Sequence, residues 1–166
     1  MMVNFHLGHD AIVGNQNVLS NNVMIAGHVH IGDYVTLAGG VGVHHYVSIG
    51  DYAYVAGLAR VDHDVPPYCK IDHEENVRAL NTIGLKRWGM PVEHIELLED
   101  VVKRLFLDRE MPLARAIKEI EAEYVSPHLA NAGINGAGNH IKGLLEFLRR
   151  RNQGRFGRYL EGLRPR

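Results

Sequence analysis

The chain has 166 residues, 46% of them hydrophobic and 22% charged, which suits one globular domain, alone or with an appendage, and excludes a disordered or fibrous protein. Its 18 basic and 19 acidic residues leave no net field that would recruit nucleic acid, and no apolar run is long enough for membrane insertion. Its one cysteine, Cys69, excludes an internal disulfide and suits a reducing compartment. Residues 1–10 do not resemble a signal peptide, so we expect a cytoplasmic protein.

The first part of the chain is an internal repeat of six residues. The first residue of ten consecutive hexads is aliphatic, from Leu7 to Val61, the second is mostly Gly or Ala, and the fifth is Ala or Val in nine of the ten. A helix of 3.6 residues per turn cannot keep this period on one face, whereas a short strand followed by a turn can. Three strands make one triangular coil, and this repeat class is known for left-handed coils. We therefore predict a left-handed parallel β-helix of hexapeptide repeats over residues 1–68.

The pattern becomes helical after Pro66, which is the first proline of the chain. Apolar residues at helical spacing, with glycine and proline as end and start signals, predict three helices. The first covers residues 76–88, the second starts at Pro91 with an apolar face over 95–105, and the third starts near Pro112 with an apolar face over 113–124. Residues 131–139 are rich in Gly and Asn and indicate a linker, and residues 141–148 suggest a last short helix before a basic tail. We therefore predict a C-terminal α-helical domain over residues 69–166.

Histidine is the one residue type that is unusually frequent in this chain. The chain has 11 histidines, and seven of them fall within the first 63 residues. Neighbouring strands of a sheet lie ~4.8 Å apart, so residues separated by one coil of 18 residues stack in a column. One such column holds His9, Gly27, His45 and His63. His28 and His44 each lie one residue from this column, so we expect His9, His28 and His44 on one edge, within roughly 10 Å of axial rise.

Such a cluster of imidazoles can support two kinds of chemistry. A neutral imidazole is a general base near neutral pH, and here Asp10 follows His9 directly while His6 precedes it by three residues. Three imidazoles can instead bind Zn²⁺. For any single histidine, an exposed turn residue without a function is the alternative. The residues by themselves leave these readings open.

Five segments give the chain a resemblance to a known family. They are HLGHDAIVGNQNVLSNN, MIAGHVHIGD, GVGVHHYVSIGDYAYV, DVPPY and NTIGLKRWG. The sequence resembles UDP-N-acetylglucosamine O-acyltransferase, the first enzyme of lipid A biosynthesis, and the HxxHD motif and the GLKR that follows DVPPY separate this family from other hexapeptide transferases. The resemblance implies transfer of a (3-hydroxy)acyl group from acyl carrier protein to the 3-position of UDP-N-acetylglucosamine. It implies no cofactor and no metal, and a homotrimer with its sites between subunits.

The resemblance also implies roles for individual residues. His9 matches the catalytic general base, Asp10 the residue that orients its imidazole, and Gly27 the backbone donor to the oxyanion. It implies further substrate contacts at His6, His28, His44, at His45, which stands where the family usually has Gln, and at the nucleotide-binding positions Asn81 and Arg87.

Two other hypotheses stay open. Members of the family carry several more N-terminal coils than this chain, so a truncated, inactive paralogue that serves as a binding or assembly protein is one alternative. A natural short form, a fragment and a misread start are equally compatible with the length. The other alternative is a β-helix zinc enzyme of the γ-carbonic-anhydrase type, which uses three histidines at a subunit interface.

Overall fold

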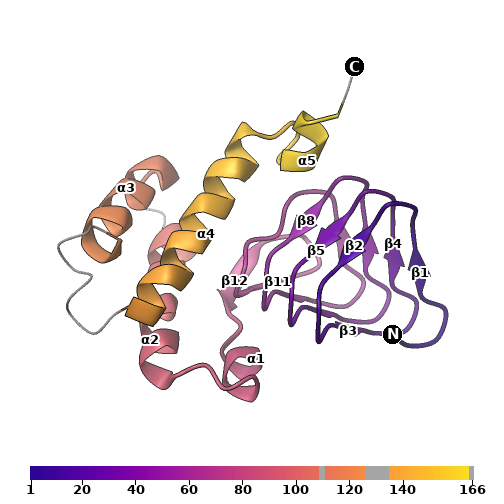
Figure 1. Ribbon diagram of the computed structural model, residues 1–166, viewed down its shortest axis with the longest axis horizontal. Helices are drawn as coiled ribbons and strands as arrows, with labels where there is room; N and C mark the ends of the chain where they lie inside the picture. Colours follow the sequence, from indigo (N-terminus) through magenta and orange to yellow (C-terminus); the bar gives the residue numbers. More distant parts are fainter. Residues whose placement is uncertain (109–110, 126–134, 165–166) are drawn as a thin grey trace.

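The computed structural model describes residues 1–108, 111–125 and 135–164. A β-solenoid occupies one end of the molecule and helices occupy the other, as Figure 1 shows. The solenoid consists of ten strands of two residues each, namely β1 (His6–Leu7), β2 (Ile12–Val13), β3 (Val18–Leu19), β4 (Met24–Ile25), β5 (His30–Ile31), β6 (Thr36–Leu37), β7 (Gly42–Val43), β8 (Ser48–Ile49), β9 (Tyr54–Val55) and β10 (Arg60–Val61). The predicted left-handed parallel β-helix is confirmed.

The ten strands form three parallel sheets, one for each side of the triangular coil. Their orders are β1-β4-β7-β10, β2-β5-β8 and β3-β6-β9. The register joins residues one coil apart, for example His6 with Met24. The third sheet continues beyond residue 68 through β11 (Cys69–Ile71), parallel to β9, and β12 (Val77–Leu80), antiparallel to β11. The division of the chain at residue 68 stays a prediction.

The solenoid core consists of the first and fifth residues of the hexads. Ile25, Leu37 and Val55 from the first position are completely buried, as is Val35 from the fifth. Burying each such side chain contributes about 1.5–3 kcal/mol. Asn17 is the polar exception at the fifth position, and its amide group bonds the carbonyls of Gly14 and Gly32 and accepts the N–H of Val35. The core therefore admits one polar side chain because the backbone around it satisfies its hydrogen bonds.

The fourth residue of each hexad turns the corner. From Asn4 to Leu58 this residue has a left-handed backbone at every sixth position, with φ between 56° and 63° at the nine that are not glycine and 73° at Gly40. Fourth residues of successive coils lie above one another, so their side chains stack. Tyr34 and Tyr52 are stacked with ring centroids 4.7 Å apart. The corners thus create three columns of side chains along the solenoid.

The helices pack around a second core. They are α1 (Thr82–Arg87), α2 (Val92–Val102), the π-helix η1 (Lys103–Leu107), α3 (Leu113–Tyr124), α4 (Asn135–Gln153) and α5 (Tyr159–Gly162). Leu85, Leu98, Ile120, Leu144 and Leu148 are almost completely buried among them. The second and third predicted helices are confirmed. No helix within the described residues combines the length and the apolar character that crossing a membrane requires.

Two predictions in this part were wrong. Residues 77–80 are strand β12 and not the start of a helix, because they pair with β11, and only residues 82–87 are helical. Residues 135–139 begin α4 and are not a linker, while residues 131–134 lie outside the described residues. Gly136 lies so close to His94 of α2 that a Cβ would clash with its ring, so this glycine serves helix packing.

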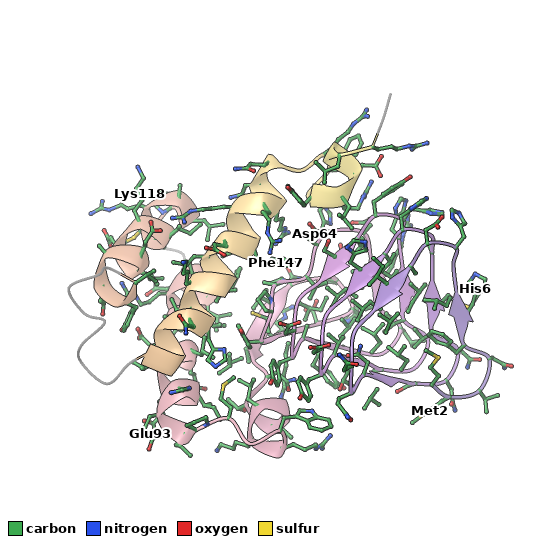
Figure 2. The ribbon with its side chains drawn as sticks, in the orientation of Figure 1. Met2, His6, Asp64, Glu93, Lys118 and Phe147 are labelled. Carbon is green, nitrogen blue, oxygen red and sulfur yellow. The ribbon has the colours of Figure 1, made fainter. Side chains whose placement is uncertain are left out.

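The C-terminal segment packs back against the solenoid, where hydrogen bonds to Asp64 hold it. The carboxylate of this buried residue accepts the N–H groups of Ser48 and Tyr159, and its own N–H donates to the carbonyl of Gly157. The guanidinium of Arg158 donates to the carbonyl of Asp62 at 2.7 Å. Figure 2 shows Asp64 in the space between the solenoid and α4.

Asp64→Ala is expected to lower the free energy of unfolding by about 2–4 kcal/mol, because it leaves the two partly buried N–H groups of Ser48 and Tyr159 without an acceptor. Urea denaturation measures this loss. Asp33→Ala is the matched control, since Asp33 also accepts a backbone N–H, from Asn15, but at an exposed position where water replaces it. Equal losses in both variants would contradict the structural role of Asp64.

Burial raises the pKa of Asp64, although the hydrogen bonds from Tyr159 and Ser48 oppose the shift. The folded protein therefore holds this proton more tightly than the unfolded chain does. Protonation of Asp64 therefore contributes to the free energy of unfolding. This contribution is fully present below the ordinary carboxyl pKa, and it is lost as the pH rises through the raised pKa of Asp64 in the folded state.

Candidate functional site

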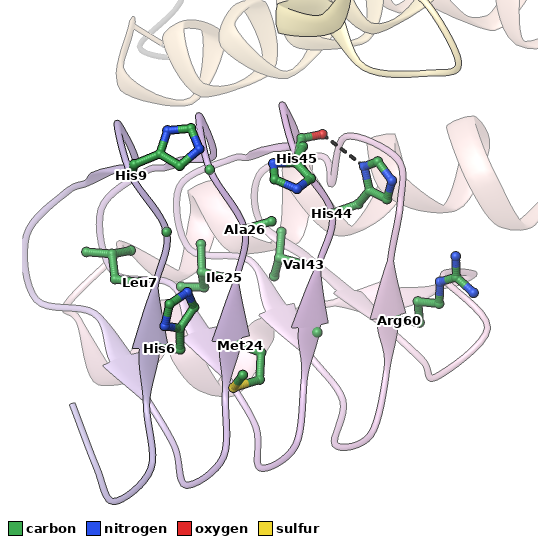
Figure 3. Close-up of a pocket in the computed structure, with 13 residues that line it drawn as sticks. His6, Leu7, His9, Met24, Ile25, Ala26, Val43, His44, His45 and Arg60 are labelled. Atoms are coloured by element: carbon green, nitrogen blue, oxygen red, sulfur yellow. Dashed lines mark hydrogen bonds between the residues drawn. The ribbon is translucent and has the colours of Figure 1, made fainter.

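A hollow of about 580 Å³ lies on the face of the sheet β1-β4-β7-β10. Five of the predicted site residues line it, namely His6, His9, Gly27, His44 and His45 (Figure 3). The rest of the wall is mainly aliphatic. The coil period therefore brings residues from three successive coils to one surface, as the column argument predicts.

His9 and Asp10 form a hydrogen-bonded pair at the corner that follows β1. The Nδ1 atom of His9 lies 2.9 Å from Oδ2 of Asp10, and φ of Asp10 is 56°. With Nδ1 donating to the carboxylate, Nε2 of the neutral imidazole carries the lone pair that can accept a proton. The hydrogen bond from His9 lowers the pKa of Asp10, so this carboxylate stays charged to lower pH than an ordinary aspartate.

Gly27 lies against the imidazole of His9. A Cβ at this position would lie 2.8 Å from Nε2 and 2.9 Å from Cε1 of His9, closer than side chains tolerate. Among the residues that the structure describes, the N–H of Gly27 has no hydrogen-bond acceptor, as holds for most residues at this hexad position. The N–H groups of Asn15, Asp33 and His63, at the same position, instead donate to carboxylates. A free backbone donor thus lies beside the candidate base.

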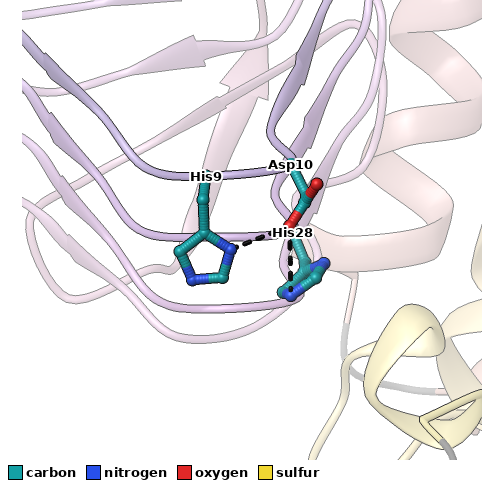
Figure 4. A group of neighbouring side chains, drawn as sticks. All are labelled: His9, Asp10 and His28. Atoms are coloured by element: carbon teal, nitrogen blue, oxygen red, sulfur yellow. Dashed lines mark hydrogen bonds and ion pairs between the residues drawn. The ribbon is translucent and has the colours of Figure 1, made fainter.

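His28 lies beside the hollow and contacts the pair from the next coil (Figure 4). Its Nε2 is 3.9 Å from Oδ2 of Asp10, and its ring meets that of His9 edge to face, with centroids 4.9 Å apart. The opposite neighbour in its column is Tyr46, whose ring is stacked on that of His28 at 4.7 Å with 3° between the planes. Sequence reasoning assigned Tyr46 no role in the site, although its distance of 18 residues from His28 was the available signal.

Two other histidines complete the wall. His44 approaches the backbone carbonyl of His45 with Nδ1 at 3.2 Å. Arg60 also lines the hollow, from β10, and sequence reasoning did not include it. The available signal was its charge, since Arg60 is the only basic residue among the first 68.

Asn81 and Arg87 do not line this hollow. Asn81 is 5% exposed and caps α1, because its side chain accepts the N–H of Gly84 and donates to the carbonyl of Tyr52. Arg87 is exposed at the end of α1. A single copy of the chain therefore does not bring these two residues together with the histidines.

Within the part of the chain that the structure describes, two groups of side chains have donor atoms close enough to bind one metal ion. The first is His9, Asp10 and His28, and the second is Asp62, His63 and Glu75. In the second group, Glu75 already accepts the N–H groups of Asp62 and His63 and bonds the ring of His63. These hydrogen bonds join a solenoid corner to the β11–β12 turn, and they are sufficient to explain why the three side chains lie together.

Comparison with known proteins finds one family. The model of a family described as UDP-N-acetylglucosamine O-acyltransferase, domain 2, matches residues 64–156. An acyl-(acyl-carrier-protein)-UDP-N-acetylglucosamine O-acyltransferase of Anaeromyxobacter dehalogenans is 39% identical over 123 residues, which are 74% of this chain and 48% of the relative. A relative of the same name from Synechocystis is 33% identical and covers 78% of this chain and 47% of its own.

The solved structures that this chain resembles have the same family name as these relatives. The UDP-N-acetylglucosamine acyltransferase of Arabidopsis superposes with a TM-score of 0.75 at 27% identity, over 87% of this chain and 49% of its own. That of Francisella novicida gives a TM-score of 0.75 at 30% identity, over 90% and 51% of the two chains. The chain thus spans about half the length of the relatives it matches.

Proposed function

Since the chain belongs to the UDP-N-acetylglucosamine O-acyltransferase family, we propose that it transfers a (3-hydroxy)acyl group from acyl carrier protein to the 3-position of UDP-N-acetylglucosamine. This is the first step of lipid A biosynthesis, and we place it in the cytoplasm. The observation that carries the proposal is the His9–Asp10 pair, with the free N–H of Gly27 beside the imidazole.

The chemistry follows from this geometry. His9 Nε2 takes the proton of the sugar 3-hydroxyl while that oxygen attacks the thioester carbonyl. Asp10 holds the imidazole and stabilises the imidazolium that forms. The N–H of Gly27 donates to the oxyanion of the tetrahedral intermediate. When the intermediate collapses, the C–S bond breaks and the departing thiolate recovers the proton from His9, so the enzyme returns to its starting state.

The remaining residues are proposed to bind the substrates. His6, His28, His44 and His45 surround the reacting centre and contact the sugar and the acyl group. Asn81 and Arg87, which do not line the hollow, are proposed to reach the nucleotide bound at a neighbouring subunit of a homotrimer. Sedimentation of the purified protein tests the trimer, and a monomer at assay concentrations would contradict a site shared between subunits.

Turnover is the direct test. The purified protein is incubated with UDP-N-acetylglucosamine and a 3-hydroxyacyl carrier protein, and the O-acylated nucleotide sugar is measured by mass spectrometry. Formation of this product supports the proposal. Binding of both substrates without product instead supports the inactive binding protein, and absence of both binding and product contradicts the family activity for this chain.

A zinc enzyme is the second candidate, because the donor atoms of His9, Asp10 and His28 lie within 4.8 Å of one another. Elemental analysis of the purified protein distinguishes the two. One tightly held zinc per subunit favours the metalloenzyme, and a metal-free protein that forms the acylated sugar excludes it.

Asp10→Asn is expected to lower kcat by roughly 10- to 100-fold, the effect of losing about 1.5–3 kcal/mol from a hydrogen bond to a charged group. The asparagine keeps the shape but cannot stabilise the imidazolium. Steady-state kinetics measure the loss, and Asp51→Asn, at a corner of another edge, is the control. An unchanged kcat would show that Asp10 does not act on His9.

A further inference from the structure

The C-terminal end of the chain reaches the corner column beside the site. Residues 157–164 lie past the part that the family model matches, which ends at residue 156. After the attachment at Asp64, α5 ends and the guanidinium of Arg164 lies over the ring of Tyr46, 5.6 Å from its centroid. In Figure 1, α5 lies beside the solenoid coils.

Tyr46 in turn contacts the site through His28. Both residues have left-handed backbones, with φ of 63° and 59°, and their rings are stacked almost in parallel. His28 then faces Asp10, at 3.9 Å, and the ring of His9. A continuous series of contacts therefore runs from the C-terminal segment to the candidate catalytic pair.

The stack restrains a side chain that would otherwise be mobile. The side chain of His28 is 38% exposed on a corner, and its ring contacts Tyr46 on one side and His9 on the other. A parallel aromatic ring fixes the plane of the imidazole, and a cation over the tyrosine ring restrains the tyrosine. Asp10 alone does not fix this plane, because 3.9 Å exceeds hydrogen-bond distance.

We propose that Tyr46 and Arg164 are positioning residues for His28, through which the C-terminal segment shapes the sugar-binding side of the site. This inference rests on the proposed function, because it assigns the benefit to the binding of UDP-N-acetylglucosamine. Neither residue is placed in contact with the reacting atoms, so both act through His28.

A second corner column provides a comparison for the stack of His28 and Tyr46. Tyr34, Tyr52 and Tyr68 stack along another edge, with centroids 4.7 and 5.8 Å apart, and no histidine lies among them. Tyr34 also packs against Trp88, with ring centroids 4.9 Å apart, so Tyr34→Leu gives an upper limit for the thermal stability that is lost when a corner stack is removed. The loss of stability in Tyr46→Leu is compared with this value.

The kinetic test separates KM from kcat. Tyr46→Leu is expected to raise KM for UDP-N-acetylglucosamine about two- to twelvefold, the range that an aromatic pair contributes, with little change in kcat. Tyr46→Phe keeps the ring and is expected to restore KM. Arg164→Ala is expected to raise KM about two- to fivefold. Arg155→Ala is the matched control, because it removes a cation just before residues 157–164 that lies over Phe156 and not over Tyr46.

A spectroscopic test does not depend on turnover. In the protein labelled at histidine, the stacked tyrosine ring is expected to shift the ring protons of His28 upfield, and the shift is lost in Tyr46→Leu but kept in Tyr46→Phe. If the native protein shows the shift but no turnover, the proposed function fails while the stack is upheld. The inference is overturned if Tyr46→Leu leaves KM or the His28 resonance unchanged, or if Arg155→Ala matches Arg164→Ala.

Discussion

Alanine in place of His9 is expected to reduce kcat by roughly 10²–10⁴-fold, because the variant lacks the group that takes the proton from the attacking hydroxyl. The side chain of His9 is 71% exposed, so its removal leaves the solenoid core intact and the melting temperature nearly unchanged. Steady-state kinetics at saturating concentrations of both substrates measure the effect.

His73→Ala is the control for this experiment, because His73 is exposed in the turn between β11 and β12 and does not line the hollow. It is expected to keep the native rate. If His9→Ala also keeps a near-native rate, the base is another residue and the mechanism built on the His9–Asp10 pair is wrong.

The second large effect is expected from Gly27→Ala, which should lower kcat by about 10²-fold. The new Cβ would lie 2.8 Å from Nε2 of His9, so the imidazole has to move, and a misplacement of ~1 Å costs a factor of this size. The backbone of Gly27 does not have positive φ, so alanine introduces no backbone strain. The Cβ would also lie 3.1 Å from the backbone carbonyl oxygen of His9, which is a tight contact, so circular dichroism and thermal melting measure the loss of stability separately from the loss of activity.

Gly39→Ala is the matched control, since Gly39 holds the same hexad position on another edge and its Cβ would meet only the carbonyl of Asn21 at 3.6 Å, an ordinary contact. It is expected to leave kcat unchanged. Equal losses in the two variants would mean that alanine disturbs the coil itself, and that crowding of His9 is not the cause.

The solenoid could be predicted from the sequence because its determinants are local. An aliphatic residue such as Ile25 recurs every six positions, and each hexad specifies one strand and one corner without reference to distant residues. The start of α4 could not be predicted in this way. Gly136 lies there against His94, a close contact between segments far apart in the chain that no local pattern shows.

The contacts of the candidate site likewise fall into two groups, those that the sequence predicts and those that it does not. The period of 18 residues predicts that His9 and Gly27 lie next to each other, and the HD dipeptide places Asp10 beside the imidazole. The position of Arg164 over Tyr46 depends on how the C-terminal segment returns to the solenoid, and no local pattern encodes that return. Sequence periodicity thus predicts contacts within the repeat and is silent on contacts that reach it from outside.

The left-handed corner at every sixth residue has a consequence for insertions and deletions. Each corner belongs to one of three columns, and the column changes with every hexad. Inserting 18 residues after Tyr46 would add a complete coil and keep each side chain of the site on its own edge. Deleting six would preserve the aliphatic core but turn everything downstream by one side of the triangle. For this chain the fold tolerates length changes in units of six, whereas the site tolerates them only in units of a complete coil.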